Sequence, residues 1–330
     1  MAFGDWPQTI KASEVTVDES KSKQMGMFTY YLGSDGNCYV KHNDDYYKVE
    51  PIIWRVLNKD YATTGKALLL AEKILTGGIP YYVDTATRTI TGAGTIEEEP
   101  NTVYPNNYKY STIRAWLNGL DVVKSDSEND STYKDKGFLQ TAFTPDAQKD
   151  IIADTMVDNT ARSTNPNSNA SKWNSGKNPY ACENTKDKIF LLSVQEATTE
   201  EYGFGEYSAS GQGNTRIRVT TGYAEATGAY QDRTTGYGGG CVRPAVSLST
   251  SCTASTLTAM PTAATTSAAI VWALFRLCQF HFSERFSLRK IDSNPCVSNN
   301  LVFSGESGWS FYSSPPENAP GRRKYGNQKK

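Results

Sequence analysis

The sequence of 330 residues lacks several features that would reveal a partner or a compartment. Lysine plus arginine number 34, aspartate plus glutamate number 35, and no basic face is evident, so we expect no nucleic-acid partner. No apolar run approaches the length that crosses a bilayer, so we expect no membrane span. The opening MAFGDWPQTI lacks the basic and then apolar order of a signal peptide. As written, the sequence predicts a cytoplasmic protein, or a secreted or cell-surface protein if a signal is missing upstream.

Residues typical of metal and catalytic sites are also scarce. The two histidines, His42 and His281, lie in no metal or catalytic spacing, and we interpret them as surface or packed imidazoles. The acidic pairs and runs at Asp44-Asp45 and Glu97–Glu99 could bind a cation, but they fit a solvated charged loop better. We therefore predict no catalytic residue, no metal ligand and no cofactor-binding residue, and we do not expect an enzyme.

The six cysteines are unevenly distributed. Cys38 and Cys182 could form a disulfide or supply a nucleophile, although two buried thiols are the simpler interpretation. The other cysteines could form a small disulfide module, but no secretory signal supports one and their spacings match no zinc pattern. These later cysteines are Cys241, Cys252, Cys278 and Cys296.

The first 240 residues carry the patterns of an α+β domain. Short runs rich in β-branched, aliphatic and aromatic residues predict strands at MFTYYLG, YYKVE, PIIWRVLN, ALLLAEKIL, KIFLL and TRIRVTT. GSDGN at residues 33–37 predicts a hairpin turn. Two long polar segments, Asp121–Thr132 and Arg162–Asn178, predict solvated loops. Strands with interspersed helices and no internal repeat predict one compact α+β unit.

Helices are predicted where a capping residue precedes an apolar face. Ser111 begins STIRAWLNGL, in which apolar residues recur on one helical face. Thr144 begins FTPDAQKDII, with proline at the first helical position. Ser193 and Glu196 form a capping box before SVQEATTEEYG, and Thr221 precedes GYAEATGAY.

The composition changes near residue 240. Residues 1–240 carry 24 basic and 31 acidic residues, whereas residues 241–330 carry 10 and 4. Tyrosine is common in the first part and is absent from Gly238 to Phe311. We therefore divide the chain into a domain, residues 1–240, and a tail of different character, residues 241–330.

A series of motifs across residues 3–237 resembles one family in order and spacing. It is similar to the C-type-lectin-fold proteins related to the variable proteins of diversity-generating retroelements, a fold that is also similar to the formylglycine-generating-enzyme family. The resemblance implies a C-type-lectin-like α+β domain. The motifs are FGDWPQT, VEPIIWRVL, ALLLAEKIL, YSTIRAWLNG, FLQTAFT, DKIFLLSVQEA and RIRVTTGYAEATGAY.

In this family the chain after GAY continues as GYGG and WWWLRSP, followed by a variable segment and a final core strand similar to GVVPALSVSL. The variable segment is displayed on the fold and binds the ligand. The present sequence departs from the pattern at Gly239 and has neither the tryptophan cluster nor the final strand. The segment from Gly239 to Phe282 replaces the variable region, so individual ligand-binding residues are not assigned.

A shift of reading frame accounts for the departure. In the shifted frame, each codon consists of the last base of one residue's codon and the first two bases of the next residue's codon, which we call the junction of the two residues. The junctions across Tyr237–Pro244 can encode WWWLRSP. In the same frame, the junctions within Ala273–Phe282 permit VVPALSVSL. Tryptophan has a single codon, so the junction from Trp272 to Ala273 must give the glycine that precedes this strand.

We therefore predict that the chain from about residue 239 onward is the variable region read out of frame. Residues 1–240 would then form an incomplete lectin-like domain, and residues 241–330 a poorly ordered tail without the apolar strands that close the core. The alternative is that CVRPAV at Cys241–Val246 is an in-frame end strand, because related families close with GVRPAL.

Three functions follow from these expectations. The resemblance implies a ligand-binding protein that recognises a protein or a glycan without catalysis, here disabled by the frame shift. The alternative is an enzyme of the formylglycine-generating or sulfatase-modifying type, implied by the shared fold alone. Such an enzyme would need a reactive cysteine pair or a histidine metal site in its C-terminal half. A structural surface domain without a variable ligand is the third reading.

Overall fold

The computed structural model describes most of the first 229 residues. It describes residues 1–61, 66–81, 87–93, 100–104, 107–159, 182–193, 196–204 and 218–229, with the backbone alone at 237–238 and 274–278. The strands are β1 (Ala2–Ile10), β2 (Val17–Met25), β3 (Phe28–Gly33), β4 (Cys38–His42), β5 (Asp45–Asn58), β6 (Lys66–Ala71), β7 (Arg88–Thr89), β8 (Thr102–Val103), β9 (Val122–Val123), β10 (Asn129–Asp130), β11 (Thr155–Val157), β12 (Thr185–Asp187), β13 (Ile189–Phe190), β14 (Arg218–Val219), β15 (Tyr237–Gly238) and β16 (Leu274–Cys278). The helical segments are α1 (Thr112–Asn118), α2 (Phe138–Ala142), the π-helical turn η1 (Ala147–Ile151), the 3-10 turns η2 (Glu196–Thr198) and η3 (Glu200–Tyr202), and α4 (Gly222–Ala226).

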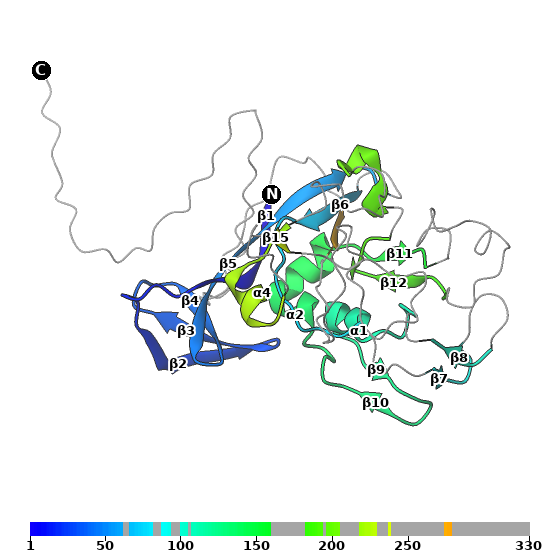
Figure 1. The fold of residues 1–330 in the computed structure, drawn as a ribbon, viewed down its shortest axis with the longest axis horizontal. Helices are drawn as coiled ribbons and strands as arrows, with labels where there is room; N and C mark the ends of the chain where they lie inside the picture. Colours follow the sequence, from blue (N-terminus) through cyan, green and yellow to red (C-terminus); the bar gives the residue numbers. More distant parts are fainter. Residues whose placement is uncertain are drawn as a thin grey trace, which may run out of the picture.

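One antiparallel sheet organises the molecule, in the order β13-β16-β6-β5-β4-β3-β2, with β1 also paired to β5. Figure 1 shows β2, β3 and β4 at one end of the molecule, α1 and α2 near its middle, and the short ladders β7-β8, β9-β10 and β11-β12 on the opposite side. The α+β class predicted from the sequence is confirmed.

The strand pattern follows the burial of the side chains. In β6, the three leucines of ALLLA are all buried, which is typical of a strand covered on both faces. In β5, Ile52 and Trp54 are buried whereas Ile53 between them is 48% exposed, as the twofold period of a strand requires. The predicted GSDGN turn joins β3 to β4, and Gly36 takes a left-handed φ of 77° there.

The core lies between the sheet and the helices α1 and α2. Trp6 on β1 packs against Trp116 of α1 at 6.1 Å and against Phe138 of α2 at 4.6 Å between ring centroids. Its indole N–H donates to the Leu75 carbonyl at 3.0 Å, so the ring is buried without losing its hydrogen bond. The tryptophan of the first motif therefore joins the N-terminal strand to both helices.

The predicted helix starts are confirmed. The Ser111 hydroxyl accepts from the Arg114 N–H at 3.2 Å, and the Thr221 hydroxyl accepts from the Ala224 N–H at 3.1 Å. The Ser193 and Glu196 side chains each accept from the other residue's backbone N–H, as a capping box does.

The segment after the capping box differs from the predicted helix. It forms two separate 3-10 turns, η2 and η3, because the backbone of Thr199 between them is extended. Similarly, the helix after Thr144 takes a π-helical hydrogen-bond pattern in η1, although the Thr144 hydroxyl accepts from the Ala147 N–H at 3.3 Å as expected.

Several strands were not expected from the sequence, among them β2 and the β9-β10 ladder. Strand β2 has the polar sequence VDESKSKQM, and the predicted loop Asp121–Thr132 contains the β9-β10 ladder. Both pair through their backbones, and β2 lies at the sheet edge, where a strand needs few apolar side chains. The other predicted loop, Arg162–Asn178, lies outside the described residues.

The expectation that the tail supplies no core strand was wrong at Leu274–Cys278. This segment forms β16, which lies between β13 and β6, with Leu274 opposite Leu70 and Phe275 opposite Ile189. A strand at this position satisfies backbone groups of β6 that would otherwise lose their partners. The rest of residues 241–330, including Cys241–Val246, lies outside the described residues, and the predictions for it stay predictions.

Candidate functional site

The segment predicted to bind a ligand, Gly239–Phe282, is attached to the fold at two described places. Immediately before it, β15 pairs with β14, with Tyr237 opposite Val219. Within it, β16 is a strand of the main sheet. Residues 239–273 between these two strands lie outside the described residues. The fold therefore fixes the chain on both sides of residues 239–273.

Helix α4, which lies between β14 and β15 in the chain, packs against residues 74–78 after β6. A parallel bridge joins Ile74 to Thr220, and the Thr227 hydroxyl accepts from the Gly77 N–H at 2.8 Å. A side chain on Gly77 would collide with the backbone of Ala229, which explains the glycine at this close approach. These contacts hold α4 against residues 74–78.

Charged side chains gather beneath β14. Arg55 on β5 makes a double hydrogen bond to Glu72, at 3.0 Å from Nε and 2.6 Å from Nη2. Arg218 on β14 is 5% exposed, and its pKa is lowered by burial and then by the positive charge of Arg55. Among the described residues, two guanidinium groups therefore lie near the single carboxylate of Glu72.

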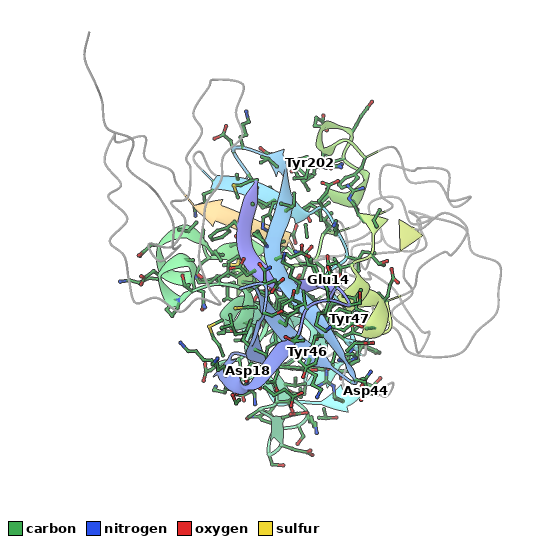
Figure 2. All side chains as sticks on the ribbon, turned by 90° about the vertical axis from the view of Figure 1, so that its left-hand side faces the viewer. Glu14, Asp18, Asp44, Tyr46, Tyr47 and Tyr202 are labelled. Atoms are coloured by element: carbon green, nitrogen blue, oxygen red, sulfur yellow. The ribbon has the colours of Figure 1, made fainter. Side chains whose placement is uncertain are left out.

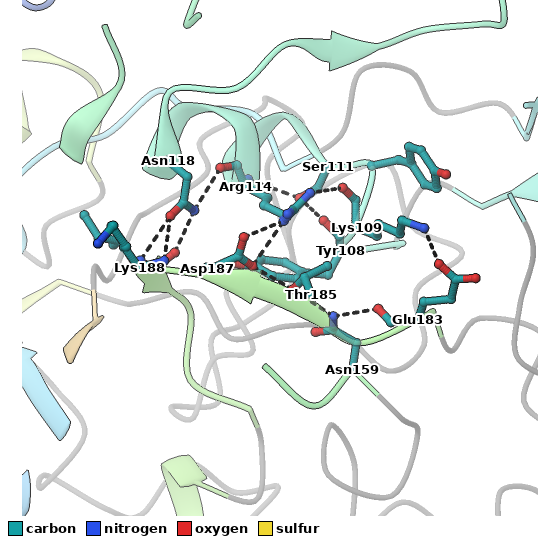
Figure 3. Close-up of polar contacts among 12 residues, drawn as sticks. Tyr108, Lys109, Ser111, Arg114, Asn118, Asn159, Glu183, Thr185, Asp187 and Lys188 are labelled. Carbon is teal, nitrogen blue, oxygen red and sulfur yellow. Dashed lines mark hydrogen bonds and ion pairs between the residues drawn. The ribbon is translucent and has the colours of Figure 1, made fainter. Parts of the chain in front are cut away.

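A second polar cluster joins α1 to β12 (Figure 3). Arg114 Nε donates to both carboxylate oxygens of Asp187, at 2.9 and 3.1 Å, and the Thr185 hydroxyl donates to one of them at 2.6 Å. The Asp187 side chain is 1% exposed. Burial lowers the pKa of Arg114, but the Asp187 carboxylate outweighs it, so the pKa is raised. With both oxygens engaged, Asp187 fixes the junction of the two elements.

Asn118 extends this cluster to the main sheet. Its side-chain oxygen accepts from the backbone N–H groups of Lys188 and Ile189, at 3.0 and 3.1 Å, and its amide donates to the Ile189 carbonyl at 2.8 Å (Figure 3). The end of α1 is thus bonded to the start of β13. This arrangement is suited to positioning elements rather than to acid–base chemistry.

A comparison with protein-family models identifies the family of this chain. One model, described as a domain of unknown function, DUF6273, matches residues 64–250, more than half of the chain. The chain belongs to the DUF6273 family. No curated protein and no solved structure matches it.

The DUF6273 match begins just before β6 and ends at Thr250. Strands β1 to β5 therefore precede the matched region, although β5 pairs with β6 in the same sheet. At the other end, the match includes Cys241–Val246, the segment that the alternative interpretation treats as an in-frame end strand.

The predictions for individual candidate residues of this DUF6273 protein can now be compared with the structure. His42 packs edge-on against Tyr223 at 5.7 Å, which confirms a packed imidazole. Asp44 is exposed in the turn between β4 and β5 (Figure 2), and Asp45 is exposed at the start of β5, which confirms a solvated charged segment. His281 and Glu97–Glu99 lie outside the described residues.

The two early cysteines of the DUF6273 protein differ from each other. Cys38, on β4, is disulfide-bonded, which corrects its interpretation as a thiol. Cys182 is a buried thiol whose backbone N–H donates to the Asn159 carbonyl at 3.4 Å. The predicted option of a bond between these two cysteines is therefore wrong.

The described part of this DUF6273 protein contains no group of three or more histidine, cysteine, aspartate or glutamate side chains placed to hold a metal ion. In the same residues, no helix is both long and apolar enough to cross a bilayer.

Sequence analysis of the DUF6273 protein missed one ionisable group, Asp5 on β1. Its carboxyl group is only partly exposed, and burial raises its pKa to about 7. The available signal was an acidic residue directly before a tryptophan, here the buried Trp6.

Proposed function

We propose that this protein is a non-enzymatic ligand-binding domain of the C-type-lectin type, related to the variable proteins of diversity-generating retroelements. Its ligand is a protein or a glycan, and its binding segment, Gly239–Phe282, is disabled by a shift of reading frame. The observation that carries the proposal is the attachment of this segment, which begins after β15 and includes β16 of the main sheet.

Residues of the motifs that carry the family resemblance form the buried core that would support the binding segment. Trp6, Trp54 and Trp116, each from a different motif, are at most 2% exposed. Binding by a displayed segment requires such a rigid support, because ordering a loop on binding costs affinity.

Two features of the tail support the frame shift. Binding surfaces of this type rely on tyrosine and tryptophan, and the present reading has no tyrosine from Gly238 to Phe311. In β16 the register sets Arg276 opposite Leu68, which is fully buried. A charged residue is unfavourable at such a position, whereas the shifted reading of Ala273–Phe282 is almost wholly apolar.

The alternative has support of its own, because the family match continues through Cys241–Val246. Under this alternative the segment is an in-frame end strand, and the chain lacks the variable region instead of misreading it. The position between β6 and β13 is occupied by β16, so an in-frame end strand would have to displace it or pair elsewhere.

The gene sequence distinguishes the two interpretations. In the shifted frame a Gly–Gly junction gives tryptophan only if the first glycine codon ends in T, and the Leu274–Phe275 junction gives valine only if the leucine codon ends in G. We therefore expect the codons of Gly238 and Gly239 to end in T and the codon of Leu274 to end in G. Other bases at these positions would refute the frame shift.

A repaired chain tests the binding function itself. One base inserted before the third base of the Tyr237 codon restores the other frame. We expect the repaired protein to unfold at a higher temperature than the chain as written and to bind components of a glycan or protein array saturably. The chain as written is the control and should bind none of them. If the repaired protein folds and binds nothing, the ligand-binding proposal fails.

A further inference from the structure

We draw no further inference here: the strongest candidate, the disulfide-bonded Cys38 on strand β4, carries none because the sulfur to which it is bonded lies outside the described residues, so nothing in the structure shows which segment the bond holds to the sheet.

Discussion

At the scale of single residues, two carboxyl groups occupy opposite environments. Asp187 is buried with both oxygens hydrogen-bonded and a guanidinium beside it. Asp5 is partly buried, and no hydrogen bond or cation in the described residues stabilises its charge. The first group should therefore stabilise the fold as a carboxylate, and the second should stabilise it only while protonated.

Asp5→Asn tests the second statement. The folded pKa of about 7 lies above the usual 3.8, so the folded state holds a proton that the unfolded state releases. Stability from this group is complete below pH 4 and is lost as the pH rises to 7. The variant should lose this pH dependence and gain about 1–3 kcal/mol at pH 8, less than the full shift implies because the group is partly exposed. Urea unfolding at pH 5 and pH 8 measures both effects, and parallel curves for the two proteins would contradict them.

Asp187→Asn tests the first statement. The change leaves the Arg114 guanidinium facing a neutral amide, and we expect the free energy of unfolding to fall by about 3–5 kcal/mol. Asp154→Asn is the control, because Asp154 is 48% exposed and pairs with Lys186 at the surface. That control should cost less than about 1 kcal/mol. Urea unfolding at pH 7 measures both, and a similar small loss in each variant would show that the Arg114 pair does not support the fold.

At the scale of elements, local signals decided where the helices begin. Ser111, Thr221 and the capping box of Ser193 were each followed by a helical segment, because an unpaired N–H at a helix start requires a nearby acceptor. The type of helix was less predictable. Capping does not determine whether the next turn is α, π or 3-10, which depends on where the chain must go afterwards.

Ser111→Ala tests the importance of one cap. The substitution removes the acceptor for the Arg114 N–H and also the hydroxyl that donates to the Tyr108 carbonyl at 2.7 Å. We expect a loss of about 1–2 kcal/mol in the free energy of unfolding, measured with urea. Ser111→Asp retains the acceptor and should recover much of the loss. An alanine variant as stable as the original would mean that α1 is held by packing alone.

The strands divide into those that sequence patterns predicted and those that they did not. The apolar runs of β3, β5 and β6 were recognised because their faces are buried. Strand β2 was missed because an edge strand is held by backbone hydrogen bonds, which leave no trace in side-chain type. Asp5 was missed for a related reason, since its pKa is raised by burial, which depends on the packing of segments that are distant in sequence.

At the scale of the whole molecule, the sheet joins both ends of the described chain. Strand β1 pairs with β5, and β16 pairs with β6. Because β5 and β6 are neighbours in the sheet, the first strand and the last described strand are held by adjacent strands. The sequence predicted a domain that ends near residue 240. The family resemblance places a final core strand at Ala273–Phe282 only in the shifted frame, whereas β16 forms there from the sequence as written. The residues alone did not predict this, because pairing between distant segments depends on the whole fold.

Two shortened chains test this arrangement. A chain ending at Gly238 lacks β16 and leaves β6 and β13 without a shared neighbour, whereas a chain ending at Phe282 retains the strand. Domain stability is only about 5–15 kcal/mol, so loss of a central strand should abolish cooperative unfolding in the first chain. The second should keep it. Circular dichroism during heating distinguishes them, and identical transitions would show that Leu274–Cys278 is not a central strand.

Strand β2 has a consequence for behaviour in crowded solutions. The outer border of the sheet is VDESKSKQM, whose serine, lysine and glutamate side chains are mostly exposed. A second sheet approaching this border would have to dehydrate several charges to gain a few backbone hydrogen bonds. This side of the protein should therefore resist growth into fibrils, even at concentrations at which a more apolar border would assemble.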